Sequence, residues 1–343
     1  MMRILIVEYV AGGGLAGRPL PPSMFVEAAA MLRAALADFG NLDGWDVITT
    51  RDPRLAGELP GNHVEMVQPG QFDATFDACL AACDAALVIA PEQGGLLAGL
   101  VERVERAGVL HLGSGSDAVR VAGDKLATLS RLGAAGVPVP PTRPAATPAA
   151  AASLGFPLVL KPRDGAGCVG LRRVLKPADL AEAWAQATAE AGGSPLIAQP
   201  YVSGRHASVV VLCDGRAALP ISLNGQEIAE GARFEYRGGV VPLEHPLRAR
   251  ALEVAARACR LVPGLRGYVG VDLVLGADAV VMEINPRLTT TYTGLRRAVG
   301  VNLAAVLLGA ARGETWGNIP LVARARFTAS GLVRVEPLEG VAA

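Results

Sequence analysis

The pattern of apolar residues changes about a third of the way along the chain. In the first third, short β-rich runs alternate with helical patterns, which favours an open parallel α/β sheet. The strands are expected at 3–8, 46–50, 86–90 and 109–112, with helices at about 23–38, 71–83 and 94–107. A further helix near 124–134 then leads into a Pro-rich connection, 137–148.

Beyond this connection, strands follow strands with short turns, which favours a mainly antiparallel α+β region. Strands are expected at 158–161, 171–175, 196–202, 206–212, 216–223, 267–275 and 279–284, and helices at 178–190, 247–261 and about 294–312. Asn224-Gly225 is typical of a tight hairpin turn.

Composition excludes several classes of protein. Of 343 residues, 51% are hydrophobic, and 32 basic residues balance 32 acidic ones. This argues against disorder and against a nucleic-acid partner, because no basic excess is present. Apolar residues are scattered among charges, so no membrane span is expected. Five cysteines without a CxxC pair, and a Glu8 that interrupts the first apolar run, predict a cytoplasmic protein without a secretory signal.

A glycine-rich segment follows the strand predicted at 158–161. The strand ends in Lys161, and Gly165, Gly167 and Gly170 follow. Glycines allow backbone N–H groups to approach phosphate oxygens, and a lysine adds a point charge for the same anion. The glycines also spell GxGxxG, but that dinucleotide fingerprint must open a helix, whereas a second strand is expected here. A loop that folds over a nucleotide fits better, and an ordinary flexible hairpin is the alternative.

Acidic and amide side chains gather in two strands near the end of the second region. Glu283 and Asn285 project from one face of their strand, and Asp272 on the neighbouring strand can share that face. Three oxygen ligands with two formal charges suit Mg²⁺ bound together with a nucleotide. Arg287 continues this side and can hold a phosphoryl or carboxylate group. The alternative is a solvent-facing acidic edge with Arg287 as its counter-ion.

Taken in order, these features resemble the ATP-grasp family. The resemblance rests on Lys125, the Lys161 strand with its glycine loop, the hinge-like stretch 197–204 and the set from Asp272 to Arg287. It covers residues 115–310 well, and the first lobe resembles the α/β half that usually precedes the ATP-grasp lobes. The implied fold is therefore α/β and α+β: a pre-ATP-grasp domain at 1–115, a central lobe at 116–195 and a C-terminal lobe at 196–343.

The resemblance implies an ADP-forming ligase that phosphorylates a carboxylate and lets an amine displace the phosphate. Lys125 and Lys161 would contact the phosphates of ATP, and Arg287 with Lys161 would act on the transferring phosphoryl group. Asp272, Glu283 and Asn285 would bind Mg²⁺, with Mn²⁺ as an alternative ion. The remaining nucleotide contacts would come from Gly165, Gly167, Gly170, Gln199, Tyr201 and Val202. One departure is that Gly204-Arg205-His206 stands where many members have an acid two residues after the glycine, so His206 is a possible substitute for the ribose contact.

Two further stretches, 8–14 and 285–292, resemble the branch that contains tyramine:L-glutamate ligase of methanofuran biosynthesis. This implies small-molecule substrates: the side-chain carboxylate of L-glutamate and a primary arylalkylamine. Arg237 and Arg296 are further candidate cations for the anionic substrate. The stretch 235–239 is a candidate substrate-facing loop, with a solvated β-turn as the alternative. Glu8 ends a strand where open α/β sheets bind ligands. A homodimer is consistent with the assemblies of many such ligases.

Four alternatives remain open on the sequence alone. One is another ATP-grasp amino-acid or peptide ligase, and the second is a kinase with the same grip on ATP. The third is a non-catalytic nucleotide-binding protein. A dinucleotide-dependent oxidoreductase comes last.

Overall fold

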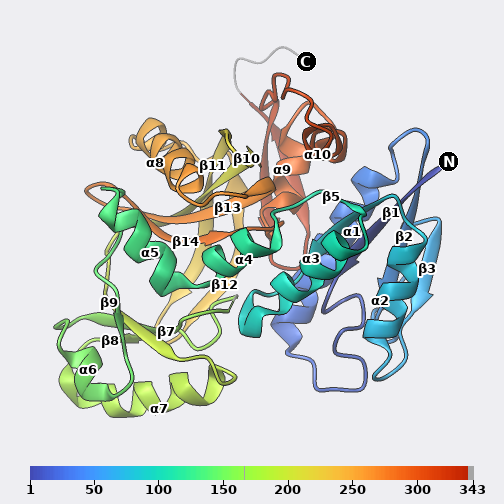
Figure 1. The fold of residues 1–343 in the computed structure, drawn as a ribbon. Helices are drawn as coiled ribbons and strands as arrows, with labels where there is room; N and C mark the ends of the chain where they lie inside the picture. The colour runs from blue at the N-terminus through green and yellow to red at the C-terminus, as the bar shows by residue number, and fades with distance from the viewer. Residues whose placement is uncertain (166, 339–343) are drawn as a thin grey trace.

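The computed structural model describes residues 1–165 and 167–338, and it contains three β-sheets. The first sheet is parallel, with the order β3-β2-β1-β4-β5, as the alternation of strands and helices predicts. Figure 1 shows it at the right, with its helices beside it. Its elements are β1 (Met2–Glu8), α1 (Pro22–Phe39), β2 (Trp45–Arg51), β3 (His63–Met66), α2 (Phe72–Ala81), β4 (Ala85–Ile89), α3 (Leu96–Arg106) and β5 (Leu110–His111).

A small antiparallel sheet, β6-β9-β7-β8, forms the second lobe at the lower left of Figure 1. Helix α7 packs against β7 and β8 and closes a compact apolar core. Two helices, α4 (Ser116–Gly123) and α5 (Lys125–Ala134), precede this lobe in the chain. The lobe contains β6 (Arg143–Pro144), α6 (Pro148–Ala152), β7 (Leu158–Pro162), β8 (Arg172–Val174), α7 (Leu180–Glu190) and β9 (Leu196–Pro200).

The third sheet is antiparallel and larger, with the order β14-β13-β10-β11-β12-β15-β16. Helix α8 packs on β10 and β11, and its Ala, Val and Cys side chains join the buried residues of those strands. The elements are β10 (Arg205–Asp214), β11 (Ala218–Glu230), β12 (Phe234–Val241), α8 (Arg248–Arg260), β13 (Arg266–Leu275), β14 (Ala279–Asn285), α9 (Tyr292–Ala298), α10 (Leu303–Ala311), β15 (Ala323–Thr328) and β16 (Val333–Pro337).

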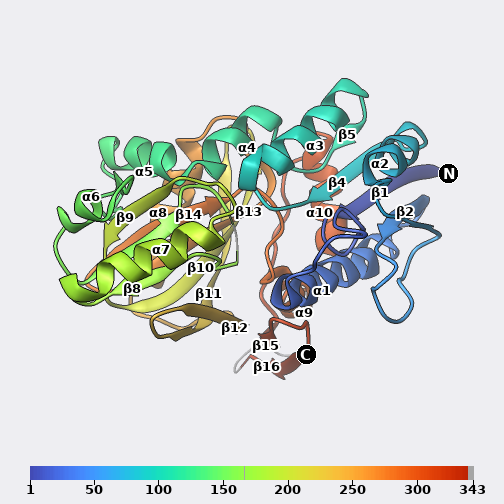
Figure 2. The ribbon, with the colours of Figure 1, turned by 90° about the horizontal axis from the view of Figure 1, so that it is seen from below.

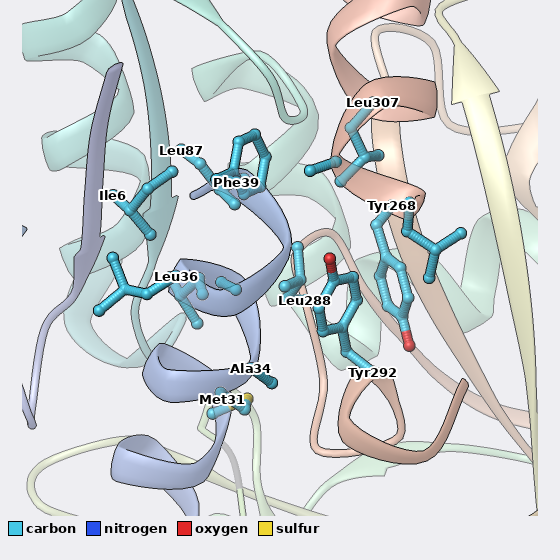
Figure 3. Close-up of a cluster of buried hydrophobic side chains, with 14 of the residues drawn as sticks. Ile6, Met31, Ala34, Leu36, Phe39, Leu87, Tyr268, Leu288, Tyr292 and Leu307 are labelled. Atoms are coloured by element: carbon cyan, nitrogen blue, oxygen red, sulfur yellow. The ribbon is translucent and has the colours of Figure 1, made fainter. Parts of the chain in front are cut away.

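One continuous core joins the first lobe to the third sheet. Figure 3 shows Leu36 and Phe39 of α1 between Ile6 of the first sheet and Tyr292 of α9. Figure 2 likewise places α1 beside α9. Helix α1 thus packs against the first sheet on one side and against α9 on the other, and this shared core fixes the first lobe against the large sheet. The cavity described below lies between them.

A buried polar contact at this junction should contribute strongly to stability. Asp38 of α1 accepts hydrogen bonds from the Tyr292 hydroxyl (2.6 Å) and Arg296 Nε (2.8 Å). We expect Asp38→Ala to lower the free energy of unfolding by about 3 kcal/mol, because it leaves a buried hydroxyl and a guanidinium without their acceptor. Urea denaturation measures this, with the exposed Asp43→Ala as a control that should change the value by less than about 0.5 kcal/mol. Equal stability of the two variants would contradict the role of this contact.

The structure corrects two local expectations in the third sheet. Asn224 and Gly225 do not form a turn but lie inside β11, where Gly225 pairs with both Ala207 and Val240. The residues 235–239 are not a loop but part of β12. Strands β3, β6, β15 and β16 were not expected at all. Within the described residues, no helix is long and apolar enough to cross a membrane.

The described residues omit Ala166, within the glycine-rich loop, and 339–343, the end of the predicted C-terminal lobe. The predicted lobe boundaries at 115 and 195 remain predictions.

Candidate active site

A single cavity is lined by all three sheets. The first lobe contributes Glu8, the last residue of β1, together with one face of α1. The small sheet contributes Lys161 of β7, and the large sheet contributes Asp272 and Glu283. The cavity thus lies at the carboxyl ends of the parallel strands, where open α/β sheets place their ligands.

Two buried lysines lie near Glu283 in this cavity, and one of them contacts its carboxylate. Lys125 Nζ lies 3.2 Å from Glu283 Oε2 and donates a hydrogen bond to the Gly165 carbonyl (2.8 Å). Lys161 Nζ donates to the carbonyl of Met282 (3.3 Å), next to Glu283. Burial lowers the pKa of Lys161 to about 8, against the raising effect of Glu283. A partly desolvated cationic pair of this kind suits an anion such as a phosphate chain.

The position of Lys125 follows from the start of α5. Asp124 caps the helix by accepting from the Ala127 N–H (3.0 Å), and it also accepts from Arg163 Nε (2.8 Å). The Lys125 N–H in turn donates to the Arg163 carbonyl (2.9 Å). The first residue of α5 is therefore tied to the chain that leaves β7, where the other lysine lies.

The predicted metal-binding side chains come together through the register of β13 and β14. Asp272 lies opposite Glu283, and Gly270 lies opposite Asn285. Asn285 Nδ2 donates to Asp272 Oδ2 (3.1 Å), and Gln226 Nε2 donates to Asp272 Oδ1 (2.9 Å). The three predicted ligands are thus neighbours on the face that lines the cavity.

The electrostatics of this set fit a divalent cation. Burial, with the charge of Glu283, raises the pKa of Asp272. Burial opposes ionisation of Glu283 too, but Lys125 and Lys161 outweigh it and lower its pKa. A cation between the two carboxylates would favour ionisation of both. Two acids and one amide suit Mg²⁺, which retains water and phosphate ligands. Elsewhere in the described residues, no group of three or more His, Cys, Asp or Glu side chains could hold a metal ion.

Arg287 lies in the cavity, but it is held by a partner that the sequence does not suggest. Its Nε and Nη2 atoms contact the two carboxylate oxygens of Glu92 at 2.9 and 3.2 Å. Glu92 belongs to the first lobe, so this bidentate pair crosses the cavity wall between lobes. The guanidinium is almost fully buried, which fixes its orientation.

The glycine-rich segment connects β7 and β8, so it does not open a helix, as expected from the sequence. Gly165 and Gly167 line the cavity and have φ values of 125° and 68°. Gly170 does not line it: a Cβ there would lie 2.8 Å from Pro162 Cγ, so this glycine allows the chain to pass Pro162. The loop also contacts the first lobe, because the Gly94 N–H donates to Asp164 Oδ2 (2.9 Å).

The hinge residues Gln199, Tyr201 and Val202 line the other end of the cavity. Gln199 is fully buried and donates to the Thr142 hydroxyl (2.8 Å), which leaves its buried Oε1 without a partner among the described residues. His206 stands where many ATP-grasp proteins have an acidic residue, and it lines the same end of the cavity. Its Nε2 atom lies 2.6 Å from Glu230 Oε1. An acid is thus present near the hinge, although it comes from β11.

Two of the cations suggested for an anionic substrate lie outside the cavity. Arg296 pairs with Asp38 at the lobe junction, and Arg237 is exposed and pairs with Glu235. Conversely, sequence reasoning missed Glu27, Glu92 and Gln226. Each of these residues has a hydrogen-bond partner that is distant in sequence, so no local spacing of residues predicts its role.

Comparison with known proteins agrees with this geometry. Residues 122–291 match the model of an ATP-grasp domain, and residues 45–119 match that of a pre-ATP-grasp domain. The chain belongs to the ATP-grasp family, and its fold is an ATP-grasp fold preceded by a pre-ATP-grasp domain. Its relatives within the family include ligases, enzymes that form C–N bonds, and the chain is an enzyme of this class.

Among the relatives are tyramine–L-glutamate ligases of two archaea. The protein of Methanocaldococcus fervens is 32% identical over 67% of this chain and 67% of its own length, and that of Methanocaldococcus jannaschii is 31% identical over 67% and 64%. The aligned region thus spans about two thirds of both. A D-alanine–D-alanine ligase from Stutzerimonas stutzeri is 30% identical over 59% of this chain and 67% of its own.

Solved structures extend the likeness over nearly the whole chain. An ATP-grasp superfamily protein from Archaeoglobus fulgidus has a TM-score of 0.71 and 28% identity, and the match covers 96% of this chain and 92% of that one. Biotin carboxylase from Campylobacter jejuni has a TM-score of 0.74 at 20% identity, covering 94% of this chain and 74% of its own, a likeness of fold alone.

Proposed function

We propose that the protein is an ADP-forming carboxylate–amine ligase that works through an acyl phosphate. The observation that carries this proposal is one cavity under a glycine-rich loop in which Lys125 contacts Glu283 and Lys161 contacts the Met282 carbonyl. Asp272 and Asn285 lie beside them. Such a site binds and neutralises a phosphate chain, and burial raises the pKa of the cavity thiol of Cys168 to about 12, which makes it a weak nucleophile. Phosphoryl transfer needs positioning and electrostatic stabilisation more than covalent catalysis.

Each predicted site residue except Gly170, which does not line the cavity, has a role in this proposal. Lys125 and Lys161 bind the phosphates of ATP, and Gly165 and Gly167 bring backbone N–H groups over them. Gln199, Tyr201 and Val202 face the base. Arg287 exchanges its contact with Glu92 for the transferring phosphoryl group as the acyl phosphate forms.

Asp272, Glu283 and Asn285 hold Mg²⁺ in this proposal, with Mn²⁺ as the alternative ion. The metal would supply charge neutralisation for the transferring phosphoryl group. In its absence these residues leave two adjacent carboxylates, whose repulsion is relieved only in part by the lysines.

For substrates, we propose L-glutamate, activated at its side-chain carboxylate, and tyramine or a similar primary amine, as in methanofuran-type cofactor biosynthesis. Support comes from the two archaeal relatives named tyramine–L-glutamate ligase, at 31–32% identity. The cavity is lined by both charge types: cations around the phosphate site, and on the first lobe the carboxylates of Glu8 and Glu27, which form no salt bridge among the described residues.

The test is a product analysis with Mg-ATP and L-glutamate, with and without tyramine. We expect ADP, phosphate and γ-glutamyltyramine in equal amounts only when both substrates are present. ADP formation with another carboxylate and amine, but not with this pair, would reject these substrates and retain the ligase reaction. A stable phosphorylated product without an amide would identify a kinase instead.

A further inference from the structure

Two carboxylates in the cavity have no cationic partner within the part of the chain that the structure describes. Glu8 at the end of β1 is only 2% exposed, and its Oε2 accepts a hydrogen bond from the Ala11 N–H (2.7 Å). Glu27 on α1 accepts from the Thr290 hydroxyl (3.0 Å). Both residues line the cavity.

The charges of the site leave these two acids unneutralised. Lys125 is paired with Glu283, Arg287 is paired with Glu92, and Lys161 contacts the Met282 carbonyl. Arg287 is near enough to lower the pKa of both Glu8 and Glu27, but burial outweighs it and raises the pKa of each, that of Glu8 to about 7. A buried carboxylate without a partner is costly, and a bound cation would remove that cost.

An apolar surface adjoins these acids on the same helix. Met24, Glu27, Ala28 and Met31 follow the i, i+3, i+4, i+7 spacing that places side chains on one face of a helix, and all four line the cavity, as does Val10. The first-lobe wall of the cavity therefore presents carboxylates together with hydrocarbon. Its complement is a molecule with a cationic head and an apolar body.

We propose that Glu8 and Glu27 bind the ammonium group of the acceptor amine, and that the Met24–Met31 face of α1 packs against the carbon skeleton of that amine. This inference rests on the proposed ligase function and adds to it the subsite for one substrate. Both acids lie near Arg287, so an amine bound there is next to the proposed phosphoryl site. The anionic donor is disfavoured at this wall because like charges repel.

The α-ammonium group of an amino-acid donor is also a cation, so Glu8 and Glu27 would attract it as they attract the ammonium group of the acceptor. The apolar face of α1 favours the acceptor, because tyramine carries an aromatic body and glutamate does not. The two sources are separated by measuring each substrate on its own.

The test uses the full chain with Glu27→Gln and Glu8→Gln, each of which keeps the hydrogen-bonding shape and removes the charge. The exposed Glu65→Gln is the matched control. Calorimetry gives the Kd of tyramine and of its uncharged analogue, in which a hydroxyl replaces the amino group. Hydroxylamine, uncharged at neutral pH, reports acyl phosphate formation by trapping it as a hydroxamate without needing an ammonium site.

We expect the Kd of tyramine to rise at least about 30-fold in Glu27→Gln and Glu8→Gln, as for loss of a buried charge partner, and to stay unchanged in Glu65→Gln. Affinity for the uncharged analogue, the KM for glutamate and hydroxamate formation should stay near wild-type values. Melting temperatures verify that the variants are folded.

An unchanged Kd of tyramine in both folded variants, or no binding of tyramine to the wild type, would overturn the inference. So would an increase in the KM for glutamate alone, which would place the ammonium group of the donor there. If the wild type forms no hydroxamate with any carboxylate but binds tyramine with the expected dependence on Glu27, the amine site stands and the ligase proposal fails.

Discussion

Replacement of Lys161 by methionine is expected to lower kcat/KM for ATP by about 10²- to 10³-fold, the usual effect of removing one preorganised electrostatic contact. Methionine keeps an unbranched apolar stem in the space of the lysine stem, so the loss is mainly one of charge. The melting temperature should not fall. Lys161 is only 4% exposed, and its lowered pKa indicates that burial of its charge is unfavourable. ADP release and calorimetric binding of ATP measure the effect.

Lys176 provides the matched control, since it is exposed and forms only a long contact, 3.9 Å, with Asp179. Lys176→Met should retain wild-type turnover and affinity for ATP. Wild-type turnover in folded Lys161→Met would remove this residue from the phosphate site.

Replacement of Glu283 by glutamine should have the larger effect, about 10³-fold on turnover, because it removes a metal-binding charge worth several kcal/mol. It also removes the partner of Lys125 and the carboxylate opposite Asp272. The half-maximal Mg²⁺ concentration should rise with the loss of turnover. A Mg²⁺ titration of ADP release measures both quantities.

The exposed Glu58→Gln controls for the loss of one negative charge far from the cavity. An unchanged Mg²⁺ dependence in folded Glu283→Gln would contradict the assignment of the metal site. Absence of ADP release from the wild-type protein with any carboxylate and amine pair would favour a nucleotide-binding protein without phosphoryl transfer.

Features that depend on local sequence could be predicted. The alternation of strands and helices gave the parallel first sheet, and period-two alternation placed Glu283 and Asn285 on one face beside Asp272. The strand after the glycine-rich loop excluded the dinucleotide fingerprint, as β8 confirms. In these cases, the residues that decide the structure lie within a few positions of one another.

The remaining features depend on contacts between distant segments. Glu27 meets Thr290, and Arg287 meets Glu92, across the junction of two lobes, so no spacing reveals them. Asn224-Gly225 illustrates the opposite error, because tertiary pairing on both edges of β11 overrides a strong turn signal. Arg296 forms a salt bridge with Asp38 of the first lobe and does not line the cavity, so here too the decisive partner is distant in sequence.

Isotope transfer from the carboxylate to phosphate shows whether ATP activates a carboxylate as an acyl phosphate. Glutamate labelled with ¹⁸O in its side-chain carboxylate is incubated with Mg-ATP and tyramine, and the released phosphate is examined by mass spectrometry. We expect one ¹⁸O atom in each phosphate, formed together with ADP and the amide, because the oxygen that joins the acyl and phosphoryl groups leaves with the phosphate. Amide formation with unlabelled phosphate, or with AMP and pyrophosphate, would contradict activation through an acyl phosphate.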